Sequence, residues 1–297
     1  MAQPAPRGPA AKLFVDPGAP LALQITWVSP PDLDPDTKAQ RREDLVEMLG
    51  FAVLNRRLER IARSGEPPFI AGGAFRGDQF HSAQFTTLSV TAQPGRWKEA
   101  LSAAEQEARR IARYGVPQLE LDREIDQLRA SLKNRADAVN TRRTPRLANE
   151  IIGTIEDSIV HTDPVQDLAL FEEQVKTIAA AEVSTVMKDA FGGSGPLVFM
   201  SSPSPIEGGD AALLAALNTS LAEPVAAAEA AVVKTWPYAS FGPIGKVAEQ
   251  TEIEDLDTVF VRFENGVRLT VKPTKFRQDE ILVTARVGDG RLSQPSD

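Results

Sequence analysis

The sequence predicts an α+β protein with a mainly antiparallel sheet and helices packed on one face. Some short stretches alternate apolar and polar residues, which is typical of strands, and longer stretches carry apolar residues at helical spacing. Their order along the chain is β-α-β-β-α-α-α-α-β, followed by a linker and a β hairpin. This order does not alternate strand with helix throughout, so it favours α+β over a doubly wound parallel sheet.

The first half of the chain begins with a Pro/Ala/Gly-rich segment, residues 1–20, which we interpret as a tail or linker. The next segment is predicted to be a strand, because Leu21, Leu23, Ile25 and Trp27 would share one face. The predicted elements of this half are a strand at Leu21–Val28, a helix from Asp36 to about Ser64, and strand segments at Phe69–Phe75 and Phe80–Val90.

Proline and glycine mark the ends of the next predicted helices. Proline is tolerated in a first helical turn, where its missing N–H would lack a partner anyway, and glycine commonly ends a helix. Four helices are expected to start at Pro94, Pro117, Thr144 and Ala180 and to end near Tyr114, Asn140, Ile159 and Phe191, with a loop after Asp163-Pro164 and a buried strand at Pro196–Met200.

The C-terminal part predicts a hairpin. Asn265-Gly266 lies between two alternating stretches, which favours a type I′ turn with positive φ at both residues, and a further strand is expected at Ile281–Val287. Three strands without a covering layer are a poor independent unit, so we expect the chain to be a piece of a longer protein. The expected division is a tail at 1–20, an α+β domain at 21–202, a helix and linker at 203–257, and the first strands of a further domain at 258–297.

Composition excludes several classes of function. The 297 residues carry a formal charge of −8, which argues against nucleic-acid binding, and the chain has no cysteine, which excludes thiolate catalysis and Cys-ligated metals. No stretch is apolar for long enough to predict a membrane span or a signal peptide.

The two histidines do not form a metal-binding motif. His81 is expected at the start of a strand, and His161 at the C-terminus of an apolar helix, where the helix dipole would favour it. Neither has a second ligand at close spacing, and a catalytic zinc ion usually needs three protein ligands. No residue is therefore predicted to be catalytic, cofactor-binding or metal-binding.

Other candidate motifs have simpler explanations. Gly192-Gly193 precedes a strand, whereas a phosphate-binding loop follows one, and no serine lies in a Gly-x-Ser-x-Gly motif. Adjacent carboxylates such as Glu43-Asp44 and Glu172-Glu173 are interpreted as solvated helix surface. Arg56-Arg57 and Arg142-Arg143 could bind a partner's carboxylate or belong to charged helix faces.

Several segments together resemble the insulinase-like, or pitrilysin-type, zinc metallopeptidases, in their bacterial four-domain branch. The region from Leu21 to Ser202 is similar to the second domain of that family. The motifs that carry the resemblance are LNRRLERIAR, RYGVPQLELDREIDQLRASL, LANEII and VSTVMKDAF followed by PLVFM. The segment WPYASFGPIGKV, at Trp236–Val247, resembles the hinge, and FENGVRLTVKPTKF resembles the first hairpin of the third domain.

The resemblance implies an architecture without a catalytic site. Zinc in this family is held by an inverted His-x-x-Glu-His helix in the first domain, and this sequence has no such motif, so the chain is expected to be inactive alone. Its partners would be the remaining peptidase domains and an unfolded peptide substrate, and intact bacterial members would be periplasmic. Two alternatives stay open: an inactive subunit that pairs with a zinc-bearing chain, and an unrelated α+β binding domain.

Overall fold

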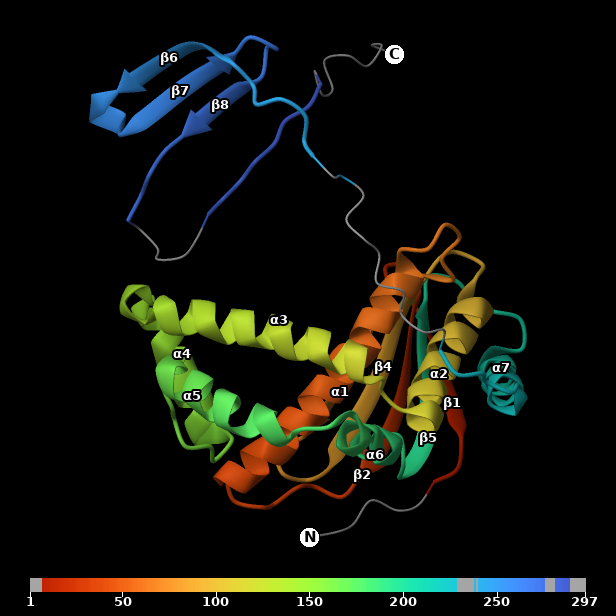
Figure 1. The fold of residues 1–297 in the computed structure, drawn as a ribbon. Helices are drawn as coiled ribbons and strands as arrows, with labels where there is room; N and C mark the ends of the chain where they lie inside the picture. Colours follow the sequence, from red (N-terminus) through yellow and green to blue (C-terminus); the bar gives the residue numbers. More distant parts are fainter. Residues whose placement is uncertain (1–6, 229–237, 239, 276–280, 289–297) are drawn as a thin grey trace, which may run out of the picture.

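In the computed structural model, which describes residues 7–228, 238, 240–275 and 281–288, the chain forms two β-sheets and a layer of α-helices (Figure 1). The described strands are β1 (Ala10–Val15), β2 (Ala22–Ser29), β3 (Phe69–Asp78), β4 (Gln84–Ala92), β5 (Ser194–Ser202), β6 (Val247–Ile253), β7 (Thr258–Phe263) and β8 (Arg268–Val271). The described α-helices are α1 (Lys38–Ala62), α2 (Trp97–Tyr114), α3 (Gln118–Asp137), α4 (Thr144–Glu156), α5 (Pro164–Gln174), α6 (Ala180–Ala190) and α7 (Gly209–Ala222). The α+β class is confirmed.

The larger sheet has five strands in the order β1-β5-β2-β4-β3 and is antiparallel except at one edge. Strand β2 pairs antiparallel with β4 and β5, and β3 pairs antiparallel with β4, whereas β1 runs parallel to β5. Leu23, Ile25 and Trp27 of β2 are buried, as their alternation predicts.

Strand β1 lies in the segment that was expected to be a tail. Ala10 pairs with Leu197, a residue 187 positions further along the chain. At the start of α7, Asp210 accepts a hydrogen bond of 2.7 Å from the N–H of Leu13 and forms a 3.0 Å ion pair with Lys12. This short strand is held by distant partners, so its own sequence gives little signal.

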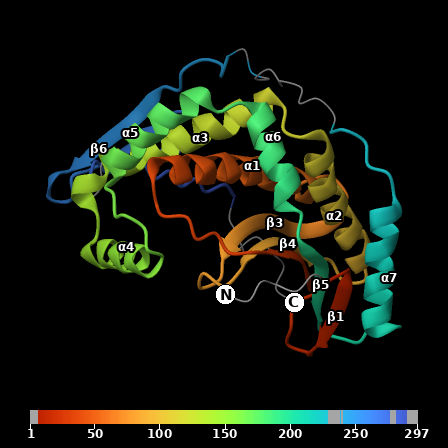
Figure 2. The ribbon, with the colours of Figure 1, turned by 90° about the horizontal axis from the view of Figure 1, so that it is seen from below.

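Helices α1, α2 and α6 pack over one face of the five-stranded sheet (Figure 2). Helix α1 begins after Thr37, whose side chain accepts a hydrogen bond from the N–H of Gln40. Gly50 allows α6 to approach α1 closely, because a Cβ at this position would overlap the side chain of Met187. The main core lies between this helical layer and the sheet. None of the helices in the described ranges is long and apolar enough to cross a membrane.

Helices α2 and α3 begin close to the predicted prolines. Helix α2 starts at Trp97. Pro94 therefore lies in the turn before the helix, whereas the sequence predicted it in the first helical turn. Gly115 follows α2 with a φ of +75°, and Pro117 directly precedes α3. The glycine is required here because few other residues adopt this conformation.

A helix, α5, occupies the segment predicted to be a loop after Asp163-Pro164. The carboxylate of Asp163 accepts hydrogen bonds from the N–H groups of Val165 and Gln166, and the side chain of Gln166 accepts one from the N–H of Asp163. This capping box, with Pro164 in the first turn, starts a helix. The loop prediction was wrong because Asp163-Pro164 is the start of α5, whereas α4 already ends at Glu156.

The smaller sheet has the order β6-β7-β8, and β6 lies within the predicted linker. In the β7–β8 turn the N–H of Phe263 donates to the carbonyl of Val267 at 2.9 Å, and that of Gly266 donates to the carbonyl of Phe263 at 3.0 Å. Gly266 has a φ of +85°, whereas Asn265 has no positive φ. The turn therefore has a three-residue loop and is not the predicted type I′ turn.

Residues 281–288 form no strand, so the predicted strand at Ile281–Val287 is wrong. The apolar side chains of this segment are exposed, and they have no neighbouring strand to pair with in the part of the chain that is described. Of the predicted hinge at Trp236–Val247, residues 236, 237 and 239 lie outside the described residues. Figure 1 shows β6, β7 and β8 apart from the five-stranded sheet.

Candidate functional site

A groove of about 1430 Å³ lies between the N-terminal half of α1, the turn that joins β3 to β4, and parts of α3 and α5 with the connection between α4 and α5. Its lining residues come from positions 32–48, 76–84, 128–135 and 156–174. The groove is therefore assembled from segments that are far apart in the sequence. We call it the acidic groove because of its lining.

Carboxylates dominate the charged side chains of the acidic groove. Nine of them line it: Asp32, Asp34, Asp36, Asp44, Glu47, Asp78, Glu156, Asp157 and Asp167. The arginines that line it are Arg41, Arg76 and Arg135, and the lining also includes His81. Two carboxylates, Asp36 and Glu47, form ion pairs with arginine. Seven are left without an arginine or lysine partner within 4.0 Å among the described residues, so the groove carries a negative charge.

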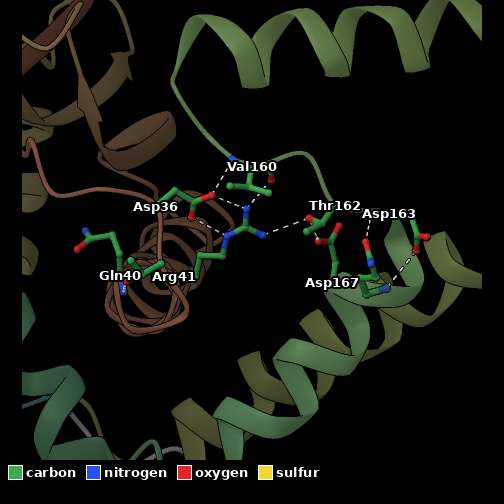
Figure 3. Close-up of polar contacts among 9 residues, drawn as sticks. Asp36, Gln40, Arg41, Val160, Thr162, Asp163 and Asp167 are labelled. Carbon is green, nitrogen blue, oxygen red and sulfur yellow. Dashed lines mark hydrogen bonds and ion pairs between the residues drawn. The ribbon is translucent and has the colours of Figure 1, made fainter.

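Asp36 and Arg41 fasten the α4–α5 connection to the start of α1 (Figure 3). Nε and Nη2 of Arg41 each donate to the Asp36 carboxylate at 2.6 Å. The same pair binds the backbone of Val160, whose carbonyl accepts from Arg41 Nη2 at 2.6 Å and whose N–H donates to Asp36 at 2.7 Å. The hydrogen bond from Arg41 is the main cause that lowers the pKa of Asp36, although burial opposes it.

The connection is also held at Thr162. Nη1 of Arg41 donates to the hydroxyl of Thr162 at 3.1 Å, and this hydroxyl donates to Asp167 of α5 at 2.5 Å (Figure 3). One arginine of α1 therefore holds both the connection and, through Thr162, the first turns of α5. These contacts set the position of one wall of the acidic groove.

Glu47 and Arg76 join the opposite wall to α1. Arg76 of β3 donates from Nη1 to Glu47 at 3.0 Å and from Nη2 to the hydroxyl of Ser29 at 3.1 Å. Burial raises the pKa of Glu47, and the charge and hydrogen bond of Arg76 oppose this rise. The pair fixes the edge strand β3 against the helix.

Asp44 lies one turn before Met48 on α1, and its carboxylate faces the groove without an ion pair to any described cation. Partial burial is the main cause that raises the pKa of Asp44, and the negative charge of Asp32 adds to it, whereas a hydrogen bond from Gln40 opposes it. The side chain is nevertheless open to solvent. A carboxylate that is partly desolvated and repelled by a neighbouring carboxylate, and that is exposed to solvent, is suited to bind a cationic group.

Large apolar side chains lie beside these carboxylates. Leu33 and Met48 are more than half exposed, Phe80 is 89% exposed at the tip of the β3–β4 turn, and Ile159 is also exposed. All four line the acidic groove. The groove therefore combines negative charge with apolar surface, which suits an amphipathic ligand.

Both histidines lie outside the elements in which the sequence predicts them. His81 lies in the turn before β4 and not at the start of a strand, and its N–H donates to Asp78 at 2.5 Å. His161 lies beyond the end of α4, which is at Glu156, so the predicted helix-dipole explanation is wrong. Within the described ranges, no group of three or more His, Asp or Glu side chains is placed to hold a metal ion.

The glycines of the α6–β5 turn serve backbone geometry, as predicted. Gly193 has a φ of +100°, and a Cβ on it would approach the carbonyl oxygen of Val28 to 2.6 Å. Gly72 and Gly73 lie inside the edge strand β3, close to an irregularity in its pairing between Phe69 and Ala71. The local backbone conformation therefore explains both glycine pairs, and neither forms a phosphate-binding loop.

Arg56 and Arg57 form neither a solvated helix face nor a free binding site. Arg57 is 2% exposed, donates from Nε to Glu120 of α3 at 2.7 Å and lies 3.5 Å from Glu107 of α2. Arg56 pairs with Glu124 of α3. Both arginines thus bind helices of the same chain.

The other charged pairs also have partners within the chain. Arg142 lies 3.8 Å from Glu150, and Glu172 and Glu173 form ion pairs with Arg129 and Lys38. No local sequence pattern predicts the acidic groove, because its carboxylates are scattered from Asp32 to Asp167. Only the neighbouring charges at Glu43-Asp44 pointed to one of its members, and they were interpreted as solvated surface.

No protein-family model matches the chain. In sequence it is similar to the chloroplastic stromal processing peptidase of Pisum sativum, with 23% identity over 313 residues that cover 89% of this chain and 24% of the relative. The corresponding protein of Arabidopsis thaliana is 28% identical over 148 residues, which cover 49% of this chain and 12% of the relative. The chain therefore spans a quarter or less of the length of these relatives.

Solved structures share the fold over most of the chain. The periplasmic protease PqqL of Escherichia coli has a TM-score of 0.68 and 15% identity, over 93% of this chain and 31% of that protein. An insulinase-family protease of Yersinia pestis has a TM-score of 0.61 and 15% identity, over 74% of this chain and 47% of the other. These similarities confirm the resemblance to the insulinase-like peptidases: the chain has their fold and resembles a part of a larger peptidase.

Proposed function

We propose that this chain is a non-catalytic segment of an insulinase-like zinc endopeptidase and forms part of the chamber that encloses the peptide substrate. The observation that carries the proposal is the acidic groove, which offers a charged and apolar surface without a group of metal ligands in the described part of the chain. The chain's fold, shared with about a third of PqqL, supports a role as one part of a larger peptidase.

The proposal assigns zinc and bond cleavage to other domains of the intact protein. The sequence lacks His-x-x-Glu-His, and the equivalent chemistry needs a metal-bound water and a nearby general base. In this proposal, β1 to β5 with α1 to α7 make one non-catalytic domain, and β6 to β8 begin a further one. The segment between them would act as the hinge.

A peptidase assay on the purified chain tests this proposal. Unstructured fluorogenic peptides are incubated with the chain, with added zinc, and with zinc followed by a chelator. We expect no hydrolysis above the buffer rate under any of these conditions. Zinc-dependent, chelator-sensitive cleavage that disappears in His81→Ala or His161→Ala would overturn the proposal.

An inactive subunit that pairs with a separate zinc-bearing chain is the second candidate. Helix α4 offers a surface that such a chain could contact, because no residue of α4 is buried and Ile152 and Ile155 are exposed to 52% and 73%. Apolar surface of this kind commonly contacts another domain or chain. Affinity purification from the native organism distinguishes the two: a separate His-x-x-Glu-His polypeptide that co-purifies in equal amount supports the subunit, and a single longer polypeptide supports the segment.

A further inference from the structure

We propose that the acidic groove binds a peptide segment in which arginine or lysine side chains lie next to apolar ones. This inference rests on the proposed function in that the intact protein would enclose peptides. The binding itself belongs to this chain and can be measured without the rest of a peptidase. The charge, the apolar surface and the size of the acidic groove each favour such a peptide.

Charge selects a cationic ligand. The seven carboxylates without an arginine or lysine partner come from separate parts of the lining, among them Asp44 on α1, Asp78 at the β3–β4 turn, and Glu156 and Asp157 at the end of α4. Like charges that face one groove repel one another, and a bound cation relieves this repulsion. Arg135, the lining arginine that remains after Arg41 and Arg76 are paired, supplies one positive charge against seven carboxylates.

The apolar surface of the groove favours a ligand that has apolar groups as well as a positive charge. Leu33, Met48, Phe80 and Ile159 line the same groove and are exposed in it. A metal ion or a small amine would leave these side chains in water, whereas a peptide with apolar residues beside its basic ones would cover them. Burial of apolar area and charge pairing would then act together.

Size favours a peptide over a small molecule. Pockets for small ligands usually have volumes of roughly 300–1,000 Å³. The acidic groove, at about 1430 Å³, is larger than this range. A peptide segment of several residues would fill more of this volume than a small molecule would.

Fluorescence anisotropy on the full chain tests the inference. The probe is a labelled peptide that alternates arginine with leucine and serine, and a second probe has glutamate in place of every arginine. We expect the arginine peptide to bind and to lose affinity as salt screens the charges, and the glutamate peptide not to bind. Equal binding of both peptides, or no binding of the arginine peptide at low salt, would overturn the inference.

Matched variants locate the binding site. Asp44→Asn with Asp157→Asn removes one carboxylate from α1 and one from the α4–α5 connection, and neither side chain has an arginine or lysine partner among the described residues. Asp189→Asn with Glu207→Gln removes the same charge from exposed positions outside the groove. We expect the groove variant to weaken binding roughly three- to tenfold and the control variant to change it by less than about twofold. Equal effects of the two variants would mean that only net charge matters and would contradict the site.

Two further measurements separate the possible outcomes. Argininamide alone should compete weakly, and competition as strong as that of the peptide would indicate a small-cation site instead of a peptide site. Mass spectrometry of the recovered peptide tests the proposed function separately. Cleavage of the peptide would contradict the non-catalytic role, whereas failure of the peptide to bind would contradict only peptide binding by the acidic groove. Circular dichroism of both variants confirms that they are folded.

Discussion

The guanidinium of Arg57 on α1 donates from Nε to the carboxylate of Glu120 on α3 at 2.7 Å, and both side chains are buried. The same guanidinium lies 3.5 Å from Glu107 of α2. One buried cation therefore joins three helices. Such a group is sensitive to the loss of a partner, because an uncompensated charge would be left out of contact with water.

Removing Glu120 should destabilise the fold strongly. Glu120→Ala leaves Arg57 with the more distant Glu107, and we expect the free energy of unfolding to fall by about 3 kcal/mol, measured by urea denaturation. The control is Glu173→Ala, which breaks an exposed 3.5 Å pair with Lys38 and should cost at most about 0.5 kcal/mol. Similar losses in the two variants would show that the buried pair has no special role.

Asn55 protects the edge of the larger sheet, and its removal should expose that edge. Its side-chain amide donates to the carbonyl of Ala74 at 3.0 Å and accepts from the N–H of Ala74 at 2.6 Å, as a neighbouring strand would. We expect Asn55→Leu to cost about 1–3 kcal/mol, because both backbone groups lose their partner. Hydrogen exchange of the Ala74 amide should accelerate more than that of Leu88 on β4, and unchanged exchange at Ala74 would contradict this protection.

Asp36 should stabilise the fold in a pH-dependent way. Its folded-state pKa lies below the ordinary value of 3.8, so the carboxylate contributes stability that is present above about pH 4 and is lost as the pH falls through the folded pKa. We expect Asp36→Asn to cost roughly 1 kcal/mol at pH 7 and progressively less below pH 4. Urea denaturation of both proteins across this range measures the difference, and a constant difference at all pH values would contradict the assignment.

Gly115 should not tolerate a side chain. Its φ is +75°, and a Cβ would overlap the side chain of Ser184 on α6. We expect Gly115→Ala to lower the free energy of unfolding by about 1–3 kcal/mol. Gly153→Ala is the control, since it lies within α4 with open space around its Cβ position and should be neutral or slightly stabilising. Thermal denaturation that ranks the two variants in the opposite order would contradict this explanation.

Local sequence patterns predicted most elements of the larger sheet and its helical layer. Strand β2 and helix α1 follow from alternation and from helical spacing, because each buries one regular face. Gly115 and Pro117 gave the break between α2 and α3, since their backbone preferences are local. The family resemblance, drawn from the same segments, agrees with the solved structures.

Elements that depend on distant partners were missed or misplaced. Strand β1 exists because β5 pairs with it, and β6 because β7 does. Conversely, Ile281–Val287 has the composition of a strand but no neighbouring strand in the described chain. Pairing between strands is a non-local interaction, and a strand's own residues do not reveal whether a partner is present.

The sequence by itself determined the fold class, the main helices and strands, the family resemblance and the lack of a His-x-x-Glu-His motif. Tertiary structure alone decided the environment of each charge. Arg57, which could have belonged to a solvated helix face, became the buried link between three helices, whereas Asp44 became part of the acidic groove. The physical reason is that burial and electrostatic interactions depend on distances between residues that the packing of the helices and strands brings together.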